Sequence, residues 1–316
     1  MSSLLDELNR LFVGQTPHMH EIGARITAVG RARGSMTLPA SPQWLGDRAR
    51  GWLHPGALTV LADSTCGLAV GAALAERAPF ATLDLRMDYL RPAVPEQDLH
   101  CDAHCFRLTR HVAFVRAEVW QTEREQPIAV AQGSFMLATA SGARTAAPQA
   151  AGDGQAWQPP AASEAVLPAD PIPYVEFLGI RVAPQAGAPL FRLPFQDKLI
   201  GNPHLPALHG GVIAAFAETA ATLHLIAMLR SPGTELWPGA PPAGVEGIGS
   251  GAKFPKGIDF SIDYLRSGRP EETFAACEVV RVGTRAALVQ VRCWQKNPAQ
   301  PIATARAHFL LTAPAG

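Results

Sequence analysis

The chain has 316 residues, of which 47% are hydrophobic and 17% are charged, a composition typical of a globular protein with ample material for a core. Its 27 Lys and Arg residues balance its 27 Asp and Glu residues, which argues against a nucleic-acid or anionic-membrane partner. The five cysteines are an odd number without the paired spacing of zinc sites, which indicates a reducing compartment and no disulfide framework.

The N-terminal segment MSSLLDELNRLF predicts a short amphipathic helix with Ser2 or Ser3 as its cap. The segment lacks the basic start and the apolar h-region of a signal peptide. Outside two stretches that we expect to be core helices, no run of about 18 uncharged apolar residues suggests a membrane span. We therefore expect a cytoplasmic protein.

The next elements outline a first domain. An opening strand pair at residues 23–29 and 35–38 precedes a loop and a long apolar helix at 56–77. Further strands are predicted at residues 82–89, 99–108, 113–122 and 128–138. Because a helix that is apolar nearly all round is buried, we expect an α+β fold in which a curved antiparallel sheet wraps the helix.

One of these strands carries a cluster of potential metal ligands, Cys101–Cys105. Side chains along a strand alternate between the two faces of a sheet, which separates these ligands, so we expect no metal site there. The sequence also shows no Ser-His-Asp set, phosphate loop or dinucleotide fingerprint. We therefore expect no cofactor.

The rest of the chain repeats this pattern after a break. Residues 139–170 are rich in Ala and Pro and lack periodicity, as in an extended linker. The second half predicts strands at 179–183, 190–194, 258–264, 273–282, 287–295 and 302–312, with a long apolar helix at 211–230. A Pro- and Gly-rich insertion at residues 231–256 is either a lid over a pocket or a surface loop.

The two halves also share residues. Three blocks recur in the same order: His54–Ser64 with His209–Thr219, Met87–Arg91 with Ile262–Arg266, and Trp120–Ala129 with Trp294–Ala303. Agreement in both order and spacing indicates an internal duplication. We therefore divide the chain into one domain at residues 1–138, the linker, and a second domain at residues 171–316.

The most informative block runs from His209-Gly210-Gly211 into an apolar helix that carries one carboxylate, Glu218. Glycines before a helix let backbone N–H groups approach a ligand closely. With the repeat and the Tyr-Leu-Arg strand ends, each half resembles a hotdog-fold thioesterase, most closely the PaaI-type acyl-CoA thioesterases. The whole chain resembles a fused double hotdog over residues 15–138 and 172–312.

This resemblance implies an acyl-CoA substrate, hydrolysed to the free acid and CoA. In that family a carboxylate and a Ser or Thr come from one hotdog unit, and a loop Asn and a glycine amide come from the other. The spacing agrees, because His209 and Glu218 are about 13 Å apart along an ideal helix and face nearly opposite sides. Hotdog fusions commonly associate further, so we expect a homo-oligomer.

The first composite site that the resemblance implies takes Asp63 and Thr82 from the first half, and Asn202, His209 and Gly210 from the second. Asp63 is expected to activate water or to attack the thioester directly, and the residues leave both mechanisms open. The Gly210 N–H is the expected oxyanion donor. Thr82 would orient the water, Asn202 would hold the water or the carbonyl, and His209 would fix the loop.

Three further residues are candidates for substrate binding. Gly211 offers a second amide at the start of the helix. Arg91 and Arg266 end equivalent strands, where each could bind a CoA phosphate or simply be solvated.

The second composite site departs from the family pattern at three positions. It takes Glu218 and Gly257 from the second half, and Asp47, His54 and Pro55 from the first. Proline has no N–H to donate, glycine offers no hydroxyl, and an aspartate stands where a neutral amide is expected. We therefore predict one working site and one degenerate site.

Two other functions compete with this interpretation. A hotdog dehydratase or hydratase would need a His and Asp arrangement that is not evident in the sequence. A non-catalytic acyl-CoA-binding or sensing protein would keep the pocket, but it would not need the full set of Asp63, Thr82, Asn202 and Gly210.

Overall fold

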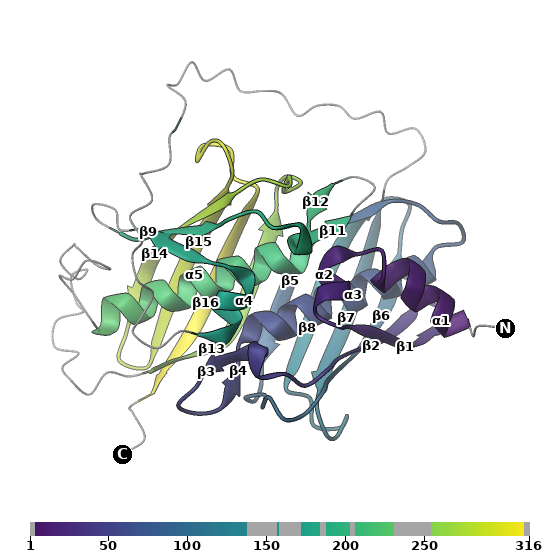
Figure 1. Cartoon of the computed structure of the whole chain (residues 1–316), viewed down its shortest axis with the longest axis horizontal. Coiled ribbons are helices and arrows are strands. Elements are labelled where there is room, and N and C mark those ends of the chain that lie inside the picture. Colours follow the sequence, from purple (N-terminus) through teal and green to yellow (C-terminus); the bar gives the residue numbers. More distant parts are fainter. Residues whose placement is uncertain are drawn as a thin grey trace.

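The computed structural model describes residues 4–137, 157, 172–183, 188–202, 206–230 and 254–312. Within these residues, twelve strands form one antiparallel sheet, and two long helices, α3 (Pro55–Ala73) and α5 (Gly210–Arg230), cross in front of it (Figure 1).

Each half of the chain contributes six strands to the sheet. The first half supplies β1 (Arg25–Gly30), β2 (Arg33–Leu38), β5 (Phe80–Tyr89), β6 (Leu99–Leu108), β7 (Val112–Trp120) and β8 (Ala129–Leu137). The second supplies β9 (Arg181–Ala183), β10 (Leu190–Leu193), β13 (Phe254–Tyr264), β14 (Thr273–Val282), β15 (Ala286–Trp294) and β16 (Ala303–Thr312). The strand order is β1-β2-β6-β7-β8-β5-β13-β16-β15-β14-β10-β9, so the second half mirrors the first about the junction of β5 and β13.

That junction joins the two halves into one sheet. Strands β5 and β13 pair antiparallel, with Leu85 opposite Ile262 and Met87 opposite Phe260. All four side chains are buried, so apolar packing reinforces the backbone pairing at the centre of the molecule.

The predicted strands are confirmed with small shifts at their ends. The helix predicted at residues 56–77 ends at Ala73, because the backbone of Leu74 is extended (φ −77°, ψ 136°). Strand β13 begins at Phe254, so the last three residues of the predicted insertion are strand, and the rest lie outside the described residues. The linker, Trp157 apart, and the proposed caps Ser2 and Ser3 also lie outside them.

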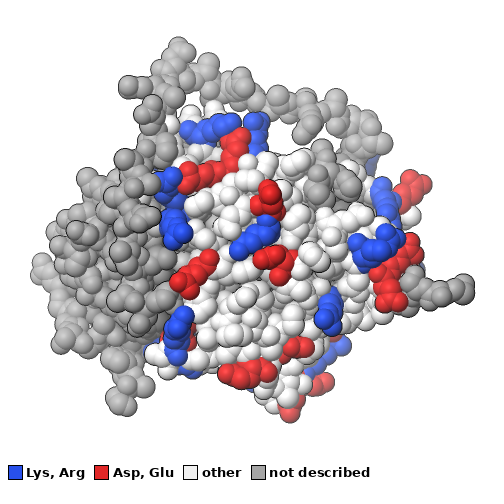
Figure 2. Space-filling view, in the orientation of Figure 1, with Lys and Arg blue, Asp and Glu red and all other residues white. Residues whose placement is uncertain are grey.

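Helices α3 and α5 pack against each other and against the sheet in one continuous core. Both are long and apolar enough to cross a membrane, but 83% of each apolar window is buried inside the protein. Burial in this core explains why they are apolar nearly all round. On the described part of the face in Figure 2, acidic and basic side chains are interspersed, without an extended patch of one sign.

Short elements that the sequence did not predict lead the chain into the long helices. The ribbon of β3 (Leu45–Asp47) and β4 (Trp52–Leu53) precedes α3, and that of β11 (Ile200–Asn202) and β12 (Ala207–Leu208) precedes α5. The single turns η2 (Pro42–Trp44) and η3 (Asp197–Leu199) come just before these ribbons. The predicted N-terminal helix is present as α1 (Leu4–Leu8), continued by the π-helical η1 (Asn9–Val13). Two further short helices, α2 (Pro17–Glu21) and α4 (Pro173–Leu178), were not predicted.

Candidate active site

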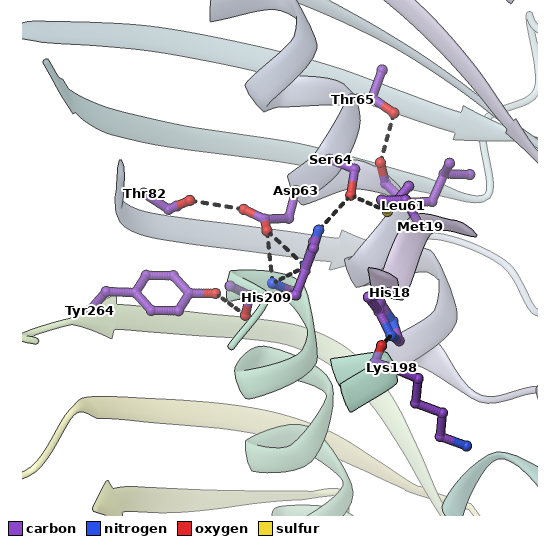
Figure 3. A network of polar contacts seen from close by, with 12 residues as sticks. His18, Met19, Leu61, Asp63, Ser64, Thr65, Thr82, Lys198, His209 and Tyr264 are labelled. Carbon is purple, nitrogen blue, oxygen red and sulfur yellow. Dashed lines mark hydrogen bonds and ion pairs between the residues drawn. The ribbon is translucent and has the colours of Figure 1, made fainter. Parts of the chain in front are cut away.

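The predicted first site centres on Asp63, which lies in the middle of α3 and is 5% exposed. Its Oδ1 accepts a hydrogen bond from Thr82 Oγ1 on β5 (3.0 Å), and its Oδ2 accepts one from the Gly211 N–H at the start of α5 (2.7 Å), as Figure 3 shows. The structure therefore brings together, from both halves, the carboxylate, the hydroxyl and the glycine-rich helix start that the sequence predicts for this site.

The amide that bonds Asp63 belongs to Gly211, a contact that the sequence did not predict, since it assigned the Gly210 N–H to the oxyanion of the substrate. The Tyr264 hydroxyl donates to the Gly210 carbonyl (2.7 Å) and so holds the peptide plane whose N–H reaches Asp63. Gly210 N–H is the first amide of α5 and has no acceptor within the helix. A Cβ on Gly210 would lie 3.0 Å from Asp63 Oδ2, so this backbone passes directly beside the carboxylate.

Both ring nitrogens of His209 are hydrogen-bonded, one to the start of α5 and the other to helix α3. Its Nδ1 accepts from the Gly211 N–H (3.0 Å), so the ring proton sits on Nε2 and is donated to Ser64 Oγ (3.0 Å). Burial lowers the pKa of His209, and the nearby Asp63 raises it in part. These contacts hold the His209 ring between the start of α5 and helix α3.

Ser64 and His18 belong to the same network, although sequence reasoning did not single them out. Ser64 Oγ lies 2.9 Å from Met19 Sδ, and the His18 ring lies 5.4 Å from the His209 ring between centroids. Burial lowers the pKa of His18 to about 3, so this ring is neutral. The repeat carried a signal for Ser64, because Thr219 occupies the same place in the second half.

The second predicted site repeats the histidine arrangement. His54 Nδ1 accepts from the Gly56 N–H (3.0 Å), and its Nε2 lies 3.4 Å from Thr219 Oγ1. Pro55 is the first residue of α3, so this helix begins without the amide that Gly210 supplies in α5.

The carboxylate of the second site, Glu218, is 2% exposed. Thr59 Oγ1 donates to Glu218 Oε2 (3.2 Å), and the Tyr89 hydroxyl lies 2.8 Å from Thr59 Oγ1. Burial raises the pKa of Glu218 to about 7, although hydrogen bonds from Tyr89 and Thr59 lower it in part. A hydroxyl therefore does reach this carboxylate, from helix α3 and not from the strand position that Gly257 occupies.

The structure brings the predicted second-site residues together around a cavity of about 100 Å³. The predicted second-site residues that line this cavity are Asp47, His54, Pro55, Glu218 and Gly257. Asp47 is paired locally: Oδ1 accepts from the Arg50 N–H (3.1 Å), and Oδ2 lies 3.4 Å from Arg50 Nη1.

Of the remaining candidates Arg91, Arg266 and Asn202, the structure places Arg91 in the wall of the second-site cavity. Arg91 donates to Gln126 Oε1 (2.6 Å) and to the Pro127 carbonyl, and it also lines the cavity. Arg266 donates to the Pro301 carbonyl (2.6 Å), so both arginines tie a strand end to a loop. Asn202 ends β11 in the ribbon before α5 and is exposed.

The described residues contain no group of three or more His, Cys, Asp or Glu side chains arranged to hold a metal ion. In the Cys101–Cys105 cluster the two cysteines are buried, whereas Asp102 accepts from Ser35 Oγ (2.6 Å) on the other face of β6. The predicted alternation of this strand is confirmed.

Comparison with known proteins covers both halves. The family model described as thioesterase superfamily matches residues 50–128 and 205–302. A putative thioesterase from Novosphingobium aromaticivorans is 18% identical with a TM-score of 0.63, and the match covers 91% of this chain and 98% of that one. A hot dog fold protein of unknown function from Alicyclobacillus acidocaldarius is 14% identical with a TM-score of 0.58, over 92% of this chain and 96% of that one.

A shorter match, to the phenylacetic acid degradation protein PaaI from Thermus thermophilus, is 28% identical with a TM-score of 0.34, over 38% of this chain and 97% of that one. The search of curated proteins gave no match. The predicted fold of two fused hotdog domains is confirmed.

Proposed function

The chain belongs to the thioesterase superfamily, and on that basis we propose that it hydrolyses an acyl-CoA thioester to the free acid and CoA at the Asp63 site. The observation that carries this proposal is the setting of Asp63. Its two carboxylate oxygens are held by a hydroxyl from one half and a backbone amide from the other, beside the first amide of α5. A buried carboxylate held in this way next to an N–H donor suits acyl transfer to water.

The chemistry needs a nucleophile at the thioester carbon and a donor for the oxygen that becomes negative. Asp63 either takes a proton from the attacking water or attacks the carbon itself to form a mixed anhydride that water then opens. In both mechanisms the C–S bond breaks and the thiolate of CoA takes up a proton. The Gly210 N–H stabilises the oxyanion, and such a donor contributes about 10²–10³ in kcat.

The other residues have supporting roles in this proposal. Thr82 orients the attacking water through its contact with Asp63 (3.0 Å). Asn202, in the ribbon before α5, holds the water or the thioester carbonyl. His209 keeps the loop and the Gly211 amide in place through its Nδ1.

The Glu218 site lacks the donor that this mechanism requires. The helix start that faces this site is that of α3, which begins with Pro55, and the next amide, Gly56 N–H, is already bonded to His54 Nδ1. Catalysis is therefore assigned to Asp63, and the two carboxylates should differ in their effect on turnover.

The test is to assay Asp63→Asn and Glu218→Gln on a panel of acyl-CoAs, following release of free thiol. Loss of the base should lower kcat by about 10²–10⁴ in the Asp63 variant, while the Glu218 variant keeps most of its activity. Both substitutions replace a carboxylate by an amide of similar shape, so each serves as the control for the other. Equal losses in the two variants, or full activity in Asp63→Asn, would contradict the assignment.

A further inference from the structure

The cavity beside Glu218 lies between the two halves. The first half contributes the β3–β4 ribbon and the start of α3 to its lining, and the second half contributes the middle of α5 and the start of β13. Much of the wall is apolar, with Leu58 from α3, Ile226 from α5 and Phe309 from β16 among the residues that line it. At about 100 Å³ the cavity is smaller than a whole-ligand pocket of about 300–1,000 Å³, so it suits the short end of a longer molecule.

The Glu218 side chain lines this cavity, and its carboxyl group is held by a hydrogen bond. Thr59 supplies the hydroxyl that Gly257 lacks, with Thr59 Oγ1 3.2 Å from Glu218 Oε2. The equivalent of Thr59 in the other half is Ala214. The hydroxyl beside the carboxylate therefore comes from strand β5 in the Asp63 site and from helix α3 in the Glu218 site. Because burial raises the pKa of Glu218 to about 7, its carboxyl is partly protonated near neutral pH and can donate a hydrogen bond to a carbonyl oxygen.

The wall of the cavity carries more basic than acidic side chains. Arg50, Arg91 and Lys256 all line it, against Glu218 and one further carboxylate, Asp47, which is paired with Arg50. The Arg50 guanidinium and the Lys256 ammonium both lie over the ring of Trp52, at 4.9 and 5.7 Å from its centroid. This combination suits a ligand with an apolar end, a carbonyl and an anionic remainder.

The same site lacks the amide that would stabilise an oxyanion. Pro55 has no N–H, and the Gly56 N–H is bonded to His54 Nδ1 (3.0 Å). This site can therefore bind a thioester carbonyl but lacks the donor that hydrolysis requires. It keeps a cavity, a carboxyl and basic side chains in its wall, but not the N–H donor at the helix start.

We infer that the Glu218 cleft is a second ligand site, which binds a short-chain acyl thioester of an anionic carrier without hydrolysing it. This inference rests on the proposed function, because it takes its ligand class from the substrate of the Asp63 site. The acyl end enters the apolar cavity, Glu218 contacts the thioester carbonyl, and Lys256 and Arg91 meet the anionic groups of the carrier. Each chain then has one hydrolytic site and one binding site.

The test counts binding sites by calorimetry with a non-hydrolysable ketone analogue of butyryl-CoA, in which a methylene separates sulfur from the carbonyl. The wild-type chain should bind two equivalents. Ile226→Trp, which places an indole in the cavity from a half-buried position, should bind one. Thermal unfolding checks that this variant is folded. One equivalent for the wild-type chain, or two for folded Ile226→Trp, would overturn the inference.

A second variant keeps the test open if Ile226→Trp does not fold. Lys256→Glu reverses one charge in the cavity wall and should weaken binding at the second site at least about tenfold, because attraction to the anionic groups of the ligand becomes repulsion. In wild-type protein, the pantetheine analogue, which has no phosphate, should not bind at the second site. If the phosphopantetheine analogue does bind there, a phosphopantetheine arm is sufficient for binding and the rest of CoA is not needed. Equal second-step affinity of wild-type protein and Lys256→Glu for the CoA analogue would overturn the inference.

An assay of acyl-CoA hydrolysis distinguishes failure of this inference from failure of the proposed function. If wild-type protein hydrolyses acyl-CoA but binds one equivalent of the analogue, the proposed function stands and the second site is wrong. If it hydrolyses no acyl thioester, the proposed function itself is wrong. A large loss of kcat in Glu218→Gln would contradict the statement that this cleft does not hydrolyse its ligand.

Discussion

Replacing Glu218 by Gln should remove a pH-dependent part of the stability of the protein. Burial raises the pKa of this carboxyl from 4.5 to about 7, so the folded chain binds the proton more tightly than the unfolded chain does. The stabilisation is therefore fully present below about pH 4.5 and is lost as the pH rises to about 7. A difference of this size corresponds to about 3 kcal/mol at a site that is 2% exposed.

The assay is urea unfolding of wild-type protein and Glu218→Gln at several pH values between about 5 and 8. Several buried histidines with lowered pKa values, His18 and His54 among them, destabilise the fold as the pH falls below about 6.5, but they do so in both proteins. Thr59, Tyr89 and Tyr174, which interact with Glu218, stay uncharged over this range. From about pH 5 to about pH 8, the unfolding free energy of Glu218→Gln should therefore rise by about 2.5 kcal/mol relative to that of wild-type protein. A difference in unfolding free energy that is flat with pH would refute the reasoning.

Three other predictions concern the Asp63 side of the molecule. Thr82→Val removes a hydrogen bond to a carboxylate and should lower kcat about 10- to 100-fold in the thiol-release assay, whereas an unchanged kcat would contradict its role. Ser64→Ala leaves the buried His209 Nε2–H without its acceptor and should cost about 1–3 kcal/mol in urea unfolding, so wild-type stability would argue against the assigned ring proton. Gly211→Ala places a Cβ 2.8 Å from the α3 backbone and should lower the thermal midpoint. Its control, Gly71→Ala, meets nothing nearer than 3.9 Å and should raise stability by up to about 1 kcal/mol. A thermal midpoint of Gly211→Ala equal to or above that of Gly71→Ala would contradict the close helix contact.

The fold could be predicted from the sequence because the duplication repeats every element. Alternating apolar residues marked the strands, and helices apolar on all sides marked the two core helices. The pairing of Leu85 with Ile262 across the junction was not visible, since neither strand carries a signal for its partner. The ribbons before α3 and α5 were missed because strands of two or three residues are too short for a periodic pattern.

The site was predictable where it depends on spacing and not where it depends on helix phase. The structure brings Asp63, Thr82 and the glycines that begin α5 together. The bond from the Gly211 N–H to Asp63 was not predicted, because it depends on how the first turn of α5 is rotated, which spacing does not fix. The hydroxyl beside Glu218 escaped prediction because it comes from Thr59, at a position that has no hydroxyl in the other half.

In the proposed mechanism, the first amide of α5 stabilises the oxyanion formed at the Asp63 site. Gly210→Pro removes that amide and begins α5 as Pro55 begins α3, with a residue that suits the first turn of a helix. Gly210→Ala is the matched control, because its Cβ also approaches Asp63 Oδ2 at 3.0 Å but its N–H remains.

The decisive measurement is the ratio of kcat between these two variants on one acyl-CoA. We predict that Gly210→Pro is about 10²–10³ slower than Gly210→Ala. Equal kcat values in the two folded variants would contradict the claim.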